Sequence, residues 1–178
     1  MIPDGNASIT FGQLAPSPIG YSYVRYSVAP AAQFQATLNG VATQAVDGAA
    51  GEYVMGATGT MAVPQLIVFP QAASVSAADR ATVRFINAVP SETTLELRES
   101  SITTDLLRAS DFGTPSDTLQ REERKYSFVI SRPGQQTVLA RIDGVELSAG
   151  RRYLLVVGPK RPTSASDTLQ YRTLWMQE

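Results

Sequence analysis

The sequence predicts an all-β protein built from two tandem β units, of which the second is an immunoglobulin-like antiparallel β-sandwich. Three observations predict this class. Nearly every patterned segment alternates apolar and polar residues at a period of two, which is typical of strands with one buried face. Glycine and proline separate these segments at short intervals, as they do in β-sandwiches. Helical patterning is scarce, since only 103–110 and 119–124 could form a turn or two of helix.

Seven short strands are expected in the second half of the chain. The dipeptide Asp143-Gly144 lies between two of them and favours a tight hairpin turn. The expected strands are Thr82–Ala88, Leu95–Arg98, Lys125–Ile130, Thr137–Ile142, Val145–Leu147, Arg152–Val157 and Leu169–Trp175.

The first half carries fewer strand patterns. Those expected are Ala7–Phe11, Tyr21–Tyr26, Glu52–Met55 and Gln65–Phe69. The segments between them are poor in side chains that could pack. We therefore expect this part to depend on the second unit or on another chain, because small domains bury too little surface to be stable alone.

The distribution of charge divides the chain. Residues 1–80 hold four acidic and two basic residues, and residues 81–178 hold the other twelve acidic and thirteen basic ones. The stretch 72–78, which consists of small residues, lies near this transition. We predict an extended N-terminal arm at 1–20, an N-terminal β unit at 21–78 and a C-terminal immunoglobulin-like β-sandwich at 79–178.

An internal repeat crosses the predicted boundary. Val24–Pro30 is similar to Val83–Pro90, at an offset of 59 to 60 residues. Each is followed by an alternating segment, Phe34–Leu38 in the first case and Thr93–Arg98 in the second. Self-similarity at a fixed offset indicates two related units in tandem.

Composition excludes several kinds of active site. The chain has 178 residues, with no histidine and no cysteine. A histidine-based triad, a thiolate nucleophile and a zinc site with Cys or His ligands are therefore impossible. The 15 basic and 16 acidic residues give a net charge of -1, whereas nucleic-acid-binding proteins usually have a basic excess. We predict no nucleic-acid partner, no cofactor and no metal.

The remaining nucleophiles and acids do not form a recognisable catalytic set. Neither Lys125 nor Lys160 has the Ser-x-x-Lys spacing that would activate a serine. The acidic pair Glu122-Glu123 lies among basic residues and is typical of a solvated turn. We therefore predict that the chain is not an enzyme. An enzyme would need two acids facing each other across a pocket, for which the candidates are Glu96, Glu99 and Glu146.

A calcium site is the remaining metal hypothesis. Asp105, Asp111 and Asp117 lie in the long connection 99–120, but their spacing of six matches no EF-hand loop. Asp111 and Asp117 are better interpreted as turn or cap residues.

Five aromatic residues are the candidates for binding a partner. Tyrosine and tryptophan combine apolar area with a polar group and are enriched at interfaces. The alternative is that these side chains pack within the sheets. The candidates are Phe11, Tyr21, Tyr23, Tyr26 and Trp175.

The second half resembles a family of bacterial secreted β-sandwich repeats of unknown function. The resemblance lies in Ala81–Pro90, which ends in an Asn-Ala-Val-Pro turn, and in 139–158 with its Ala-Gly-Arg-Arg-Tyr turn. The two-unit layout and Ile9–Arg25 are also similar to the periplasmic accessory proteins of alginate O-acetylation. These resemblances imply an extracytoplasmic, protein-binding role and supply no catalytic residue.

The predicted function is a non-catalytic structural or adaptor subunit that binds other protein subunits in an extracytoplasmic or membrane-associated bacterial complex. The alternative is a carbohydrate-binding or polysaccharide-modification accessory protein, with a polysaccharide as partner. Residues 1–5 lack the basic start and apolar core of a signal peptide, so we expect that the targeting segment is not present in this chain. A cytoplasmic location stays open.

Overall fold

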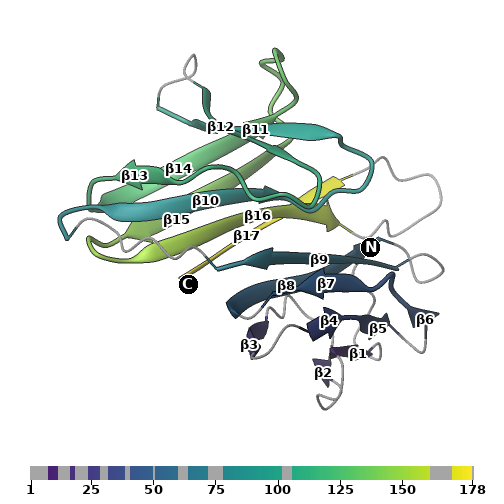
Figure 1. The fold of residues 1–178 in the computed structure, drawn as a ribbon. Coiled ribbons are helices and arrows are strands. Elements are labelled where there is room, and N and C mark those ends of the chain that lie inside the picture. Colours follow the sequence, from purple (N-terminus) through teal and green to yellow (C-terminus); the bar gives the residue numbers. More distant parts are fainter. Residues whose placement is uncertain are drawn as a thin grey trace. The chain divides into compact units, whose positions relative to one another are not determined.

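A computed structural model of the chain describes residues 8–11, 17–18, 24–28, 32–38, 41–49, 51–59, 64–71, 78–101, 106–160 and 170–177. Every regular element in these ranges is a strand, which confirms the predicted all-β class (Figure 1). The described residues therefore include no helical segment that could cross a bilayer. The chain divides into two compact units, Met1–Ala72 and Ala73–Glu178.

The first unit consists of short antiparallel sheets. One has the order β2-β1-β5-β6, another β3-β8-β9, and β4 pairs with β7. Phe34, Val54, Ile67 and Phe69 are its large buried apolar side chains among the residues described. The strand bounds are β1 Ser8–Phe11, β2 Ser17–Pro18, β3 Val24–Val28, β4 Ala32–Phe34, β5 Ala36–Leu38, β6 Val41–Ala42, β7 Val46–Gly48, β8 Gly51–Gly59 and β9 Pro64–Pro70.

Gly48 permits a close packing contact in the first unit. It lies on β7 opposite Ala32 of β4, beside the ring of Phe34. A Cβ atom at position 48 would overlap that ring. The Phe34 ring in turn packs against Tyr53, with 4.8 Å between ring centroids. Glycine is therefore needed here for close approach rather than for an unusual backbone conformation.

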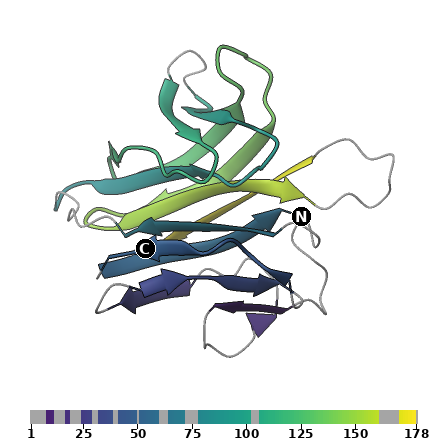
Figure 2. The same ribbon diagram turned by 45° about the vertical axis from the view of Figure 1, so that its right-hand side comes forward.

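The second unit is a sandwich of two four-stranded sheets, whose layers are seen from two directions in Figures 1 and 2. One sheet has the order β13-β10-β16-β17 and the other β12-β11-β14-β15. All pairs are antiparallel except β10 and β16, which run parallel from Thr82–Arg152 to Asn87–Val157. The bounds are β10 Ala81–Asn87, β11 Thr94–Glu99, β12 Leu106–Asp111, β13 Leu119–Arg121, β14 Arg124–Ser131, β15 Ala140–Leu147, β16 Arg152–Lys160 and β17 Gln170–Gln177.

The core lies between these two sheets. Alternate residues such as Leu95 and Leu97 of β11 belong to it, as the period-two pattern predicts. Strand β10 is central in its sheet, and all seven of its residues are buried. The buried apolar cluster consists of Ala81, Val83, Phe85, Val89, Leu95, Leu97, Leu119, Tyr126, Phe128, Ile130, Ile142, Val145, Leu147, Tyr153, Leu155 and Val157.

The predicted hairpin at Asp143-Gly144 is wrong. Strand β15 runs through this dipeptide without reversing. Tyr126 of β14 pairs with Val145 and Phe128 pairs with Ile142, so two residues of β15 lie opposite one residue of β14. This is a β-bulge, in which Gly144 has a φ of 71°. Some bulges and the two-residue hairpin turns both use a residue with positive φ, so the dipeptide fits either structure.

The two segments that could have formed a turn or two of helix are strands where the structure describes them. Described residues of 103–110 belong to β12, and 119–121 form β13. Strand β13 pairs with β10, and Leu119 is part of the buried cluster. Pairing at the sheet margins and burial of one apolar side chain outweigh a weak local helix preference. The described second unit thus has eight strands, where seven were predicted.

Candidate functional site

The candidate site is the edge strand β17, the last strand of its sheet. It pairs only with β16 among the described strands, over eight residues from Tyr153–Gln177 to Lys160–Gln170. The opposite edge of the same sheet is β13, which is only three residues long. A long edge strand is a template on which another extended segment can pair.

Strand β17 is anchored by its inward side chains. Tyr171 packs against the buried cluster. The hydroxyl of Thr173 donates a hydrogen bond of 2.8 Å to the backbone carbonyl of Arg141 on β15. The ring of Trp175 lies 6.0 Å from that of Tyr153, at an angle of 49°. Polar and aromatic contacts therefore hold β17 against the sandwich.

Trp175 combines an anchoring contact with exposure. Its exposed fraction is 37%, which makes it one of three large exposed apolar side chains in the described part of the chain. The other two are Val41 and Val138. The contact with Tyr153 fixes the indole while part of it faces solvent. Of the predicted partner-binding residues, Trp175 is thus in a position to contact another molecule.

The other predicted partner-binding residues belong to the first unit. Phe11 lies on β1 opposite Ala36, and Tyr26 lies on β3 opposite Tyr53. The structure describes their backbone pairing only. Tyr21 and Tyr23 lie outside the described residues.

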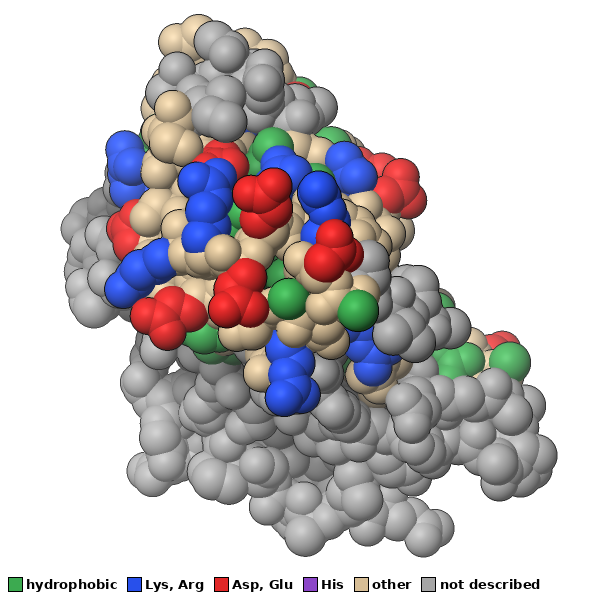
Figure 3. Space-filling model, turned by 90° about the vertical axis from the view of Figure 1, so that its left-hand side faces the viewer, with side chains coloured by type: hydrophobic (Ala, Val, Ile, Leu, Met, Phe, Trp, Pro, Cys, Tyr) green, Lys and Arg blue, Asp and Glu red, His purple; other side chains and the backbone are tan. Residues whose placement is uncertain are grey.

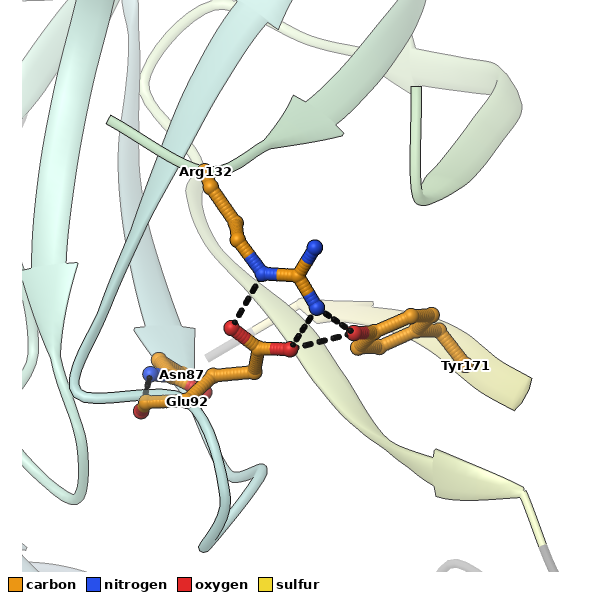
Figure 4. Close-up of polar contacts among 4 residues, drawn as sticks. All are labelled: Asn87, Glu92, Arg132 and Tyr171. Atoms are coloured by element: carbon orange, nitrogen blue, oxygen red, sulfur yellow. Dashed lines mark hydrogen bonds and ion pairs between the residues drawn. The ribbon is translucent and has the colours of Figure 1, made fainter. Parts of the chain in front are cut away.

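A polar cluster around the buried Glu92 contacts the start of β17. We call Glu92, Arg132 and Tyr171 the polar clamp; Figure 4 shows its contacts. Arg132 donates from Nε to one carboxylate oxygen of Glu92 at 2.9 Å and from Nη2 to the other at 2.7 Å. The Tyr171 hydroxyl donates to the second oxygen at 2.5 Å. The clamp joins the turn after β10, the residue after β14 and strand β17.

Asn87 holds the turn that carries Glu92 of the polar clamp. Its side chain is fully buried, and Nδ2 donates to the backbone carbonyl of Glu92 at 2.7 Å. Its Oδ1 accepts from the backbone N–H of Val89 at 2.9 Å. An Asn side chain that bonds the backbone two residues on is typical of a turn. These contacts explain the asparagine of the Asn-Ala-Val-Pro turn, since one side chain satisfies a donor and an acceptor.

The clamp keeps Glu92 charged and Tyr171 neutral. Hydrogen bonding from Arg132 holds the pKa of Glu92 below its usual value, although burial opposes this shift. Burial and the hydrogen bond to Glu92 raise the pKa of Tyr171 to about 12. At neutral pH the carboxylate therefore accepts three hydrogen bonds. Sequence reasoning missed the clamp because its members come from three distant segments and form no local motif.

The other acids considered for catalysis lie beside basic side chains. Glu96 pairs with Arg98 at 2.6 Å, and both side chains are largely buried. Glu99 accepts from Arg124 at 2.9 Å and from Ser101 at 3.0 Å. The third candidate, Glu146, lies 3.6 Å from Lys125 on an exposed surface.

Described charged side chains of both signs lie on one face of the molecule. On the face seen in Figure 3, the described Lys and Arg side chains are interleaved with Asp and Glu side chains. Within the described residues, no group of three or more His, Cys, Asp or Glu side chains is arranged to hold a metal ion.

Comparison with protein-family models found no matching family, and comparison with curated proteins found no significant match. The resemblances inferred from the turn motifs therefore stay predictions.

Proposed function

We propose that the chain is a non-catalytic structural or adaptor subunit, which binds and stabilises partner proteins in an extracytoplasmic or membrane-associated bacterial complex. The observation that carries this proposal is the edge strand β17, with its eight-residue ladder to β16 and its exposed Trp175. Partner binding by strand addition uses the backbone of such an edge for affinity and nearby side-chain contacts for specificity.

The paired acids favour a binding role over a catalytic one. Glu92, Glu96 and Glu99 are buried, and each contacts an arginine at 2.9 Å or less. Their geometry suits structural ion pairs that fix strands and turns. In this proposal the sandwich is a rigid support that presents β17.

The test is co-purification of the native complex, followed by mass spectrometry, with the intact chain and two single variants. Trp175→Ala removes the exposed indole, and we expect it to reduce recovery of the partner. Val138→Ala is the matched control, since Val138 is similarly exposed (40%) but lies outside the strands. Equal partner recovery with both variants would refute a role for β17.

A second variant tests the N-terminal segment. Deleting residues 1–20 removes β1 and β2, which pair with each other, and β1 also pairs with β5. We expect assembly to be lost while the second unit stays folded, as monitored by fluorescence of Trp175, the only tryptophan of the chain. An intact complex after this deletion would contradict the predicted contribution of the arm.

Carbohydrate binding is the second candidate, because an exposed indole can stack on a sugar ring. The purified chain would then bind a polysaccharide without any partner protein. Affinity electrophoresis in gels containing alginate tests this directly. Retardation that is lost in Trp175→Ala and kept in Trp175→Phe would favour this candidate, and unchanged migration of the intact chain would exclude alginate as the ligand.

A further inference from the structure

Strand β17 is the least protected of the four edge strands described in the sandwich. Its ladder with β16 runs over eight residue pairs without a shift of register. Proteins block pairing at sheet edges by short strands, bulges and charged residues. Strand β13 has three residues, and a shift of register interrupts the ladders of β12 and β15, which each carry more than one charged residue. Of the residues of β17, only Arg172 is charged.

The hydrogen bonds of β16 show which backbone groups of β17 face outward. Strand β10 runs parallel to β16, and its side of the ladder includes bonds from the N–H groups of Thr82 and Ala88 to the carbonyls of residues 151 and 157. The odd-numbered residues of β16 therefore direct their backbone groups toward β10 and the even-numbered ones toward β17. Even-numbered residues of β16 and β17 lie opposite each other, so the even-numbered residues of β17 bond to β16.

The outward backbone groups in the middle of β17 belong to Tyr171, Thr173 and Trp175. Among the described residues, no backbone-to-backbone hydrogen bond outside the ladder with β16 involves these three. The bond from Thr173 to Arg141 of β15 uses the side-chain hydroxyl. The contacts of Tyr171 with the polar clamp also use its hydroxyl. The attachment of β17 to the sandwich therefore leaves these N–H and C=O groups available for another strand.

Two positions beside this edge indicate the chemistry of a pairing segment. The indole of Trp175 is 37% exposed, so an apolar side chain opposite it would bury further area. Position 172 lies on the other face of the strand, opposite Gly158. A Cβ atom at Gly158 would meet no described atom within 4 Å, so this face is open beside position 172. An acidic side chain across from an arginine stabilises a strand pair, and a basic one destabilises it.

We infer that the partner segment is an extended strand that pairs antiparallel with β17, with an apolar side chain opposite Trp175 and an acidic side chain opposite Arg172. Antiparallel pairing is slightly more stable per residue than parallel pairing. In this orientation the apolar residue precedes the acidic one by three positions, the separation of residues 172 and 175. This inference rests on the proposed function, because it names the chemistry of the partner at the same edge.

Two synthetic peptides test the pairing. The acidic probe is Thr-Val-Ile-Val-Thr-Glu-Thr, which places Ile opposite Trp175 and Glu opposite Arg172, and the basic probe has Lys in place of Glu. Each is added to the isotope-labelled intact chain, and exchange of the backbone amides with solvent is measured by NMR. In the unbound chain, the amides of residues 171, 173 and 175 should exchange at least about tenfold faster than those of residues 172 and 174. The acidic probe should slow these three amides.

Reversal of one charge tests the acidic preference. The intact chain should bind the acidic probe about three- to tenfold more tightly than the basic probe, and Arg172→Glu should reverse this preference. Lys125→Glu makes the same change of charge at an exposed position of the other sheet and should keep the original preference. Near-ultraviolet circular dichroism shows that both variants are folded. A preference that does not reverse in Arg172→Glu would overturn the acidic assignment.

The location of the slowed amides tests the strand pairing itself. Because a free peptide is a weak ligand, the acidic sequence is also appended to Glu178 through a Gly/Ser linker, which raises its effective concentration. Slowed exchange on β12, β13 or β15 instead of β17, or unchanged exchange on β17 with both forms of the probe, would overturn the inference. A native partner that is lost in Trp175→Ala but leaves the amides of β17 unprotected would retain the adaptor role and reject the strand pairing.

Discussion

Replacing Glu92 by Gln tests how much the polar clamp stabilises the second unit. The substitution keeps the size and shape of the side chain but removes the negative charge. In the folded protein the carboxylate accepts two hydrogen bonds from Arg132 and one from Tyr171. The amide of glutamine has one acceptor oxygen, so at least one donor of Arg132 or Tyr171 faces its NH2 group instead. The remaining hydrogen bonds then have an uncharged acceptor.

The expected loss follows from these contacts. Hydrogen bonds to charged groups contribute about 1.5–3 kcal/mol and neutral ones about 1 kcal/mol. The Glu92 side chain is only 8% exposed, but that of Arg132 is 44% exposed and can bind water instead. We therefore expect the free energy of unfolding of the second unit to fall by about 2 to 3 kcal/mol. The control Glu146→Gln should cost less than about 0.5 kcal/mol.

Urea unfolding followed by Trp175 fluorescence measures this loss. Trp175 is the only tryptophan and belongs to the second unit, so the signal does not report on the first. The pH dependence provides a stricter test. Because the pKa of folded Glu92 lies below its ordinary value of 4.5, its stabilisation is present above pH 4.5 and is lost as the pH falls through the folded pKa. The free energies of unfolding of the intact chain and of Glu92→Gln should therefore converge as the pH falls below 4.5. A difference between them that stays constant over this range would refute the reasoning.

Three further perturbations test neighbouring features. Tyr171→Phe should be less stable than the intact chain at neutral pH. As the pH rises from 10 to about 12 the intact chain should lose more stability than the variant, because the unfolded tyrosine ionises before the folded one. Urea unfolding at a series of pH values measures both effects, and identical alkaline curves for the two proteins would contradict the prediction. Asn87→Ala leaves the N–H of Val89 and the carbonyl of Glu92 without their partner. The free energy of unfolding in urea should fall by about 2 to 4 kcal/mol, and a fall below about 0.5 kcal/mol would show that water replaces both contacts. Gly48→Ala displaces the Phe34 ring and should destabilise the first unit by about 1 to 3 kcal/mol. The measurement is hydrogen exchange of the β7 and β8 amides, which should become faster while Trp175 fluorescence does not change. Unchanged exchange would mean that the ring moves aside at no cost in free energy.

The period-two pattern was a good guide wherever burial determines the structure. Val83 and Phe85 were expected on one face of a strand, and both belong to the buried cluster. The pattern failed at Asp143-Gly144, since the choice between a turn and a bulge depends on the register with β14 and not on the dipeptide alone. Local preference also failed at Leu119, because pairing with β10 is a tertiary contact.

The candidate site was partly predictable. Trp175 was named from residue type alone, and its exposure on the edge of a sheet is a property of the folded unit. The clamp could not be predicted, because Arg132 is separated from Glu92 by 40 residues and Tyr171 by 79. Glutamate, arginine and tyrosine are also common surface residues. Their roles become evident only when the turn, the end of β14 and β17 are placed in space.

The parallel pairing of β10 with β16 has a consequence for biosynthesis. The paired residues are about 70 positions apart, and β10 is made first. Until β16 leaves the ribosome, the margin of β10 that pairs with it stays open, and the core lacks Tyr153, Leu155 and Val157. Such nonlocal closure slows folding and prolongs exposure to aggregation. Nascent chains that end before residue 152 should therefore be the ones that recruit chaperones.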